Sequence, residues 1–86
     1  MRIGKVIGSV VSTQKHDSLV GKKLMIVKCI DSHTEDTPEL VAADSVGAGV
    51  GEYVLLTMGS VAREVFDDER TAVDCAIVGI IDSFEK

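Results

Sequence analysis

Hydrophobic residues occur along this chain in short runs rich in valine and isoleucine, separated by polar or glycine-containing segments. Runs of this length and composition are typical of β-strands. The pattern predicts five strands, at residues 2–13, 23–31, 40–46, 52–59 and 73–84. The segments at 14–23 and 32–39 are predicted to be connections, and the second of them holds the only proline.

One segment departs from the strand pattern. Residues 60–66 contain apolar pairs spaced four residues apart, beginning at Val61 and Ala62, which indicates a short helix with Ser60 as its N-cap. A helix of about two turns is not stable alone, so we expect it to pack on the sheet.

The length of 86 residues is sufficient for one domain, covering residues 1–86. Five strands and one short helix in this length predict a mainly β fold, a small five-stranded OB-like barrel. Closure of the barrel would pair the strand edges that an open sheet leaves exposed.

The predicted strands are apolar on both faces, whereas a strand with one solvated face alternates apolar and polar residues. In the run 73–84, Cys75 and Ile77 lie on one face, and Ala76 and Val78 lie on the other. One barrel buries one face, and the single predicted helix is too short to cover the rest. We therefore expect another copy of the chain to bury the second face. The pattern does not give the number of copies, and a twofold dimer is the commonest soluble oligomer.

Charge and composition exclude some classes of protein. The net charge is -5 and aromatic residues make up 3% of the chain, so the basic surface and stacking platform of a nucleic-acid binder are missing. No apolar run approaches the roughly 18 residues of a membrane span. The first residues lack the features of a signal peptide, so we expect a mature cytoplasmic strand there. Cys29 and Cys75 are predicted to be buried thiols in a reducing cytosol, with one disulfide as the alternative.

Three alternating glycines, Gly47, Gly49 and Gly51, raise the question of a phosphate-binding loop. The dinucleotide motif G-x-G-x-x-G fails in both registers, because Glu52 or Val54 stands where the third glycine belongs. Phosphate loops also lead into a helix, and this one leads into a predicted strand. We therefore predict a glycine-rich hairpin connection, in which the backbone takes positive φ angles and another chain can approach closely.

The polar residues do not form a recognisable catalytic or metal-binding set. His16 and His33 lie in separate polar segments without a second ligand at metal spacing. The acidic residues at 35–36 and 67–69 are predicted to be solvated turns. The sequence therefore predicts no enzyme, no cofactor and no metal.

Asp44 and Glu52 flank the glycine turn. We expect their carboxylates to accept hydrogen bonds from N–H groups of the turn or to meet a basic neighbour such as Arg63.

Several blocks of the sequence, in their order and spacing, resemble the bacterial microcompartment vertex family, which is the EutN/CcmL family. The blocks are "VIGSVVSTQKHDSLVGKKLMIV", "LVAADSVGAGVGEYVLLTMGSVAR" and "VDCAIVGIID", and the resemblance covers about residues 1–83. It implies an OB-like barrel that assembles into a homopentamer at the five-fold vertices of a polyhedral shell in the bacterial cytoplasm. It also implies hexameric shell proteins as partners, enclosed metabolic enzymes, and a structural rather than catalytic role.

The resemblance also suggests a site. Gly47, Ala48, Gly49 and Gly51 match the glycine turn of the family, and we expect them near a subunit boundary or an axial opening. Glu52 and Arg63 match polar positions of the same blocks, so a charge-assisted contact between subunits is our hypothesis for this pair. The alternative function is an OB-like binding module for a small ligand or protein partner.

Overall fold

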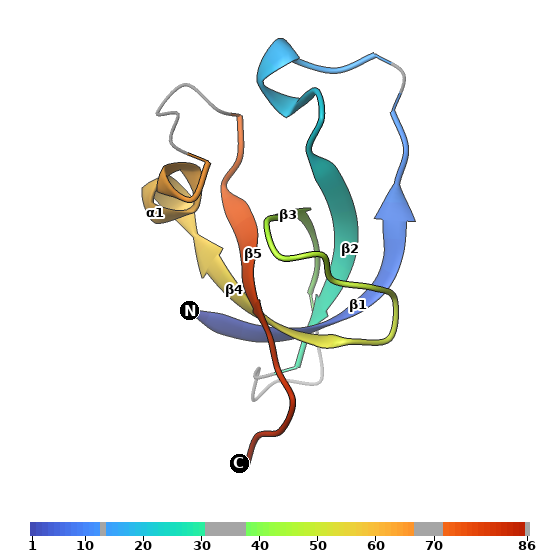
Figure 1. Ribbon diagram of the computed structural model, residues 1–86, viewed down its shortest axis with the longest axis vertical. Helices are drawn as coiled ribbons and strands as arrows, with labels where there is room; N and C mark the ends of the chain where they lie inside the picture. Colours follow the sequence, from blue (N-terminus) through green and yellow to red (C-terminus); the bar gives the residue numbers. More distant parts are fainter. Residues whose placement is uncertain (13, 31–37, 67–71, 86) are drawn as a thin grey trace.

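The computed structural model describes residues 1–12, 14–30, 38–66 and 72–85. A 3-10 turn and one short helix accompany five strands (Figure 1). The elements in chain order are β1 (Arg2–Val10), η1 (Asp17–Leu19), β2 (Lys23–Cys29), β3 (Glu39–Asp44), β4 (Tyr53–Met58), α1 (Gly59–Glu64) and β5 (Cys75–Ile80).

The strands close into a barrel in the order β1-β2-β3-β5-β4. The long first strand pairs with both β2 and β4, and only β3 and β5 run parallel. This closed arrangement confirms the predicted five-stranded barrel with one short helix. A bulge between Val6 and Gly8 on β1, and an irregularity between Leu55 and Leu56 on β4, interrupt the regular registers. Bulges of this kind bend a strand, which a barrel this small requires.

The barrel interior is filled by alternate residues of the strands. Its largest fully buried side chains are Val6, Met25, Val27, Cys29, Val54, Leu56 and Ile77. Gly4 also lies in this interior, where a Cβ atom would clash with Val27 Cγ1 and would lie 3.1 Å from Leu56 Cδ1. The interior is therefore narrow at this level and has room only for glycine.

A second, smaller core lies outside the barrel, beneath α1. The helix buries Ala62 against Ala43, Val73 and Ala76. The chain itself thus covers part of the second apolar face, which the sequence analysis assigned to another copy. Three of these four residues are alanines, so their small side chains let a short helix come close to the sheet.

Several predicted boundaries were wrong. The run 2–13 leaves the sheet after Val10, and the run 73–84 is a strand only over Cys75–Ile80. Ser60 does not cap α1, because the helix begins at Gly59 directly after β4, and its N-cap is Met58 without a side-chain hydrogen bond. The positive φ of 67° at Gly59 makes this sharp change from strand to helix possible.

The turn η1 was predicted only as part of a connection. It forms because His16 acts as its N-cap, with Nδ1 accepting a hydrogen bond from the Ser18 N–H. The predictions for His33 and for the acidic residues at 35–36 and 67–69 lie outside the described residues, as does most of the predicted 32–39 loop.

Both cysteines are buried and have free thiols, as predicted. In the part of the chain that the structure describes, no helix is long and apolar enough to cross a membrane.

Candidate functional site

The glycine turn, residues 45–52, leaves the end of β3 and passes over one side of the barrel (Figure 1). The Asp44 carboxylate fixes its first half by accepting hydrogen bonds from Val46 N at 3.0 Å and Ala48 N at 2.7 Å. Only 1% of the Asp44 side chain is exposed, and Lys23 Nζ lies 3.8 Å from Oδ2. The first half of the turn is therefore anchored by the buried, hydrogen-bonded carboxylate of Asp44.

The second half of the turn is fixed in a similar way. The Glu52 carboxylate accepts a hydrogen bond from Gly49 N at 2.6 Å. The backbone then joins β1, with Gly51 N donating to Val6 O at 2.8 Å and Val6 N donating to Glu52 O at 2.9 Å. Asp44 and Glu52 thus bind N–H groups of the turn, which was one of the two roles predicted for them.

Ala48 lies at the centre of the turn and is fully buried in the barrel core. Its carbonyl accepts a hydrogen bond from Lys23 Nζ at 2.7 Å, so β2 also holds the turn in place. Since its side chain closes the barrel interior, Ala48 cannot offer that side chain to a neighbouring subunit. Any contact by this turn depends on the residues around Ala48.

The alternating glycines differ in conformation. Gly47 and Gly51 have φ angles of 81° and 94°, which L-residues rarely adopt, and Gly49 is outside that region. A Cβ atom at Gly47 or Gly51 would meet nothing within 4 Å, whereas one at Gly49 would lie 3.2 Å from Glu52 Oε1. The first two glycines are therefore needed for the shape of the turn, and space lies open beside them.

These contacts determine what the turn can do chemically. The N–H groups of Val46, Ala48, Gly49 and Gly51 are all bonded to oxygen atoms of the chain itself. A phosphate would have to displace two carboxylates that already hold these donors. The turn is therefore a structural element whose N–H donors are already occupied, which makes it a poor binding site for an anion.

Arg63, the basic member of the predicted site, lies half-buried in the last turn of α1. It follows Ala62, which packs in the small core beneath the helix. Glu52 lies at the far end of the glycine turn, and its carboxylate is engaged with Gly49. The predicted contact between these two residues concerns neighbouring subunits and stays a prediction.

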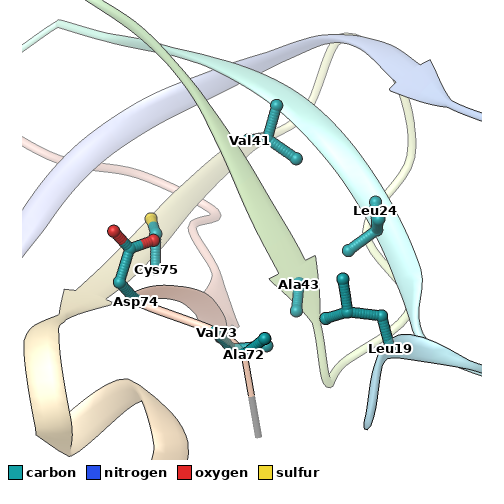
Figure 2. A pocket seen from close by; sticks show the side chains of 8 residues that line it. All are labelled: Leu19, Leu24, Val41, Ala43, Ala72, Val73, Asp74 and Cys75. Atoms are coloured by element: carbon teal, nitrogen blue, oxygen red, sulfur yellow. The ribbon is translucent and has the colours of Figure 1, made fainter. Parts of the chain in front are cut away.

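An apolar groove lies on the outer surface of β2 and β3, beside η1 (Figure 2). Leu19, Leu24 and Val41 line one side of it, and the segment leading into β5 lines the other, with Val73 and Asp74. The groove has a volume of about 190 Å³. Val41 is 51% exposed at this position, so a large apolar side chain of the sheet meets solvent.

A second exposed apolar surface lies where β4 begins and β5 has ended. The rings of Tyr53 and Phe84 pack edge to face with centroids 5.4 Å apart. Each residue is 38% exposed, and so is nearby Ile80. Lys5 Nζ lies 5.5 Å from the centre of the Tyr53 ring. The pairing of these two aromatics was not predictable from the sequence, in which residue 84 falls at the end of a predicted strand.

The remaining polar contacts near the groove are structural. The Ser18 hydroxyl lies 2.8 Å from His16 Nδ1 and accepts a hydrogen bond from Ala72 N at 2.9 Å, which ties η1 to the segment before β5. No group of three metal-ligating side chains occurs among the residues that the structure describes.

Burial raises the pKa of the Cys75 thiol to about 11, and the nearby Cys29 and Asp74 add to the shift. A thiol with so high a pKa is a poor nucleophile at neutral pH, because little thiolate is present.

Comparison with known proteins identifies the family. The model of the family described as ethanolamine utilisation protein EutN/carboxysome matches residues 1–82. The chain belongs to the EutN/CcmL family. The resemblance noted in the sequence blocks is thereby confirmed over nearly the whole chain.

Two shell vertex proteins of the EutN/CcmL family are similar to this chain in sequence. The chain is 50% identical to the bacterial microcompartment shell vertex protein PduN of Salmonella typhimurium, over 96% of this chain and 97% of that protein. It is 48% identical to the carboxysome shell vertex protein CcmL of Gloeobacter violaceus, over 96% of this chain and 84% of CcmL.

Solved structures agree with this EutN/CcmL assignment. The GrpN pentameric microcompartment shell protein from Rhodospirillum rubrum has a TM-score of 0.85 and 44% identity, covering 100% of this chain and 99% of GrpN. The structure of Gloeobacter violaceus CcmL gives a TM-score of 0.87 at 44% identity, covering 100% of this chain and 90% of CcmL. PduN and GrpN are thus described as bacterial microcompartment shell vertex proteins, and CcmL as a carboxysome shell vertex protein.

Proposed function

We propose that this chain is a structural shell protein that forms a homopentamer and closes the five-fold vertices of a bacterial microcompartment. The observation that carries the proposal is the similarity to GrpN, a pentameric shell protein, over the full length of this chain. The names of PduN and CcmL as shell vertex proteins support the same role. The chain would then lie in the shell, in the bacterial cytoplasm, with hexameric shell proteins around it.

The surface of the chain supports assembly into a ring. Exposed apolar side chains occur on two different parts of the barrel, the groove on β2 and β3 and the aromatic pair beside β4. A closed ring is built from one contact between two different surfaces of each subunit, repeated around the axis. Two unlike apolar surfaces on one chain meet this requirement, whereas a twofold dimer needs only one.

The described residues favour a structural role over catalysis. Backbone N–H groups of the glycine turn donate to carboxylates of the chain itself, the Cys75 thiol has a raised pKa, and His16 caps the turn η1. Each of these groups is bonded within the chain or buried. We therefore propose that the chain is not an enzyme and that it acts through the surfaces it presents.

We also propose that the glycine turn, with Gly47, Gly49, Gly51 and Glu52, lies near the boundary between subunits. The open space beside Gly47 and Gly51 leaves room for a neighbouring chain. Arg63 is the proposed partner of Glu52 across that boundary, since a contact between two ionised groups is stronger than a neutral hydrogen bond.

The vertex role is tested by co-expressing the chain with a hexameric shell protein and imaging the particles by electron cryomicroscopy. We expect closed polyhedra with density for five copies at each vertex, and open or extended assemblies when the chain is left out. Closed particles of the same shape without the chain, or density for it away from the vertices, would contradict the proposal.

A further inference from the structure

We propose that the groove on β2 and β3 of one subunit receives the Tyr53 ring from the Tyr53–Phe84 pair of the next subunit, and that this contact closes the ring. The inference rests on the proposed pentamer and specifies which surfaces form it. The largest apolar side chains that line the groove are Leu19, Leu24, Val41 and Val73, and Asp74 lies at its edge.

The groove is suited to an aromatic side chain in size and in chemistry. A cavity of about 150 Å³ holds a benzene ring, and the groove has a volume of about 190 Å³. Its walls are apolar, and Asp74 supplies one hydrogen-bond acceptor at the edge. A tyrosine ring combines an apolar body with one hydroxyl donor, which is why tyrosine is common at interfaces. Tyr53 is the only tyrosine of the chain.

The aromatic pair is prepared for such a contact. Tyr53 is held from one side by the Phe84 ring and approached from another by Lys5 Nζ. A side chain that is already fixed loses less conformational entropy on binding. Aromatic residues that are exposed in the free subunit and buried in the complex contribute much of the binding free energy at interfaces.

The two surfaces lie on different parts of the barrel, as a ring requires. In the closed strand order, β1 separates β4 from β2 on one side, and β5 separates β4 from β3 on the other. A subunit that binds one neighbour through its groove therefore keeps its aromatic pair free for the other neighbour. The same contact can then repeat until the ring closes.

Opposite charges stand at the two surfaces. Lys5 Nζ lies over the Tyr53 ring, and Asp74 lies at the edge of the groove. Surfaces of opposite charge favour the encounter and fix the relative orientation of the partners.

Two variants and their mixture test the contact. Val41→Lys places a charge in the groove and leaves the aromatic pair intact, whereas Tyr53→Glu removes the aromatic ring and leaves the groove intact. We expect each variant alone to have the native mass of a single chain. When the two are mixed, the intact groove of one fits the intact pair of the other, so we expect heterodimers and no larger species. The shape-conserving variants Val41→Thr and Tyr53→Phe serve as controls and should remain pentamers.

The outcomes distinguish this inference from the proposed function. A pentameric wild type with a pentameric Val41→Lys or Tyr53→Glu variant would overturn the inference alone, and so would a mixture that stays monomeric. A wild-type chain that is not a pentamer would overturn the proposed function itself. Formation of the heterodimer also shows that both variants are folded, because only folded surfaces can pair.

Discussion

At the scale of single residues, two carboxylates hold the glycine turn in place. Asp44 satisfies two backbone N–H groups from a side chain that is almost fully buried, and Glu52 satisfies a third. The role of both carboxylates as acceptors for the turn was predictable, because they flank it in the sequence. The burial of Ala48 was not, since nothing in the alternation of small residues indicates that the turn folds back into the barrel.

Replacing Asp44 by alanine should destabilise the fold. The change leaves two N–H groups without their acceptor and removes the partner of Lys23, so we expect the free energy of unfolding to fall by about 2–3 kcal/mol. Urea denaturation at a fixed chain concentration measures the loss, because the stability of an oligomer depends on concentration.

The exposed Asp82 provides the control for this change. Asp82→Ala should alter stability by less than about 0.5 kcal/mol, as is usual at exposed positions. Equal stability of the Asp44→Ala variant and the wild type would show that the turn does not need its anchor.

The buried thiol of Cys75 makes stability depend on alkaline pH. Its pKa is raised from 9.0 to about 11 in the folded chain, chiefly by burial, so the unfolded chain loses this proton first. Stability should be unaffected by this group below pH 9 and should fall between pH 9 and 11, by an amount on the order of 2 kcal/mol.

The variant Cys75→Ala separates this effect from the titration of lysine and tyrosine. It should show a shallower loss of stability between pH 9 and 11 than the wild type, measured by denaturation at each pH. Identical pH profiles for the two proteins would contradict the assignment to Cys75.

At the scale of elements, the number of strands and their places along the chain followed from the sequence, but their ends did not. The apolar runs continue past the points where the strands end, at Val10 on β1 and at Ile80 on β5. The extra apolar residues there serve other contacts, as Phe84 does with Tyr53. The hydrophobic pattern of a segment indicates which residues are buried or in contact. Pairing with the neighbouring strands of the barrel determines where a strand ends.

The helix illustrates a related limit of the sequence. Its position was predicted correctly to within a residue or two, but Ser60 was expected as the cap, and α1 instead starts from Gly59. The chain turns directly from β4 into the helix, which the positive φ of that glycine permits. Which glycine takes a positive φ depends on the neighbouring strand, and this was not visible in the sequence.

The narrow interior of the barrel gives a prediction for β1. In Gly4→Ala, the new methyl group would clash with Val27 and lie close to Leu56, so the strand would have to move away from β2 or β4. Overpacking of this kind costs about 1–3 kcal/mol. We expect a matching fall in the free energy of unfolding, measured by urea denaturation.

Gly8 is the matched control on the same strand. Its nearest side-chain neighbour to an added Cβ is Ile26 at 3.5 Å, which is an ordinary contact. Gly8→Ala should therefore cost clearly less than Gly4→Ala, and a larger cost at Gly8 would contradict the account of the interior.

At the scale of the whole molecule, a small barrel that is apolar on two outer surfaces needs partners to cover them. The sequence predicted this need from strands that are apolar on both faces, although α1 covers part of one face itself. The number five came from the resemblance to the family and could not come from periodicity. The pattern of apolar residues shows that a surface must be covered by another chain. The angle between two such surfaces determines how many copies close the ring.

The glycine turn is tested at this scale by Gly49→Val. Within the subunit, the added Cβ atom comes close only to the Glu52 carboxylate, so the fold should lose on the order of 1 kcal/mol through one weakened hydrogen bond. If the turn lies at the subunit boundary, the bulkier residue should instead abolish the pentamer, which native mass spectrometry detects.

The control for that experiment is Glu52→Gln, which keeps an acceptor oxygen for Gly49 N and removes the charge. It should retain the pentamer with weaker association if Glu52 meets Arg63 of a neighbour. A Gly49→Val variant that assembles normally would place the turn away from the boundary.

The most direct test of the account is the native mass of the purified wild-type chain, by native mass spectrometry at micromolar concentration. We predict a species of five copies, as expected for a ring built from one repeated contact between two unlike surfaces. A single copy would contradict the claim that the two apolar surfaces are covered by other copies of the chain. Any other closed number would contradict its place at a five-fold vertex.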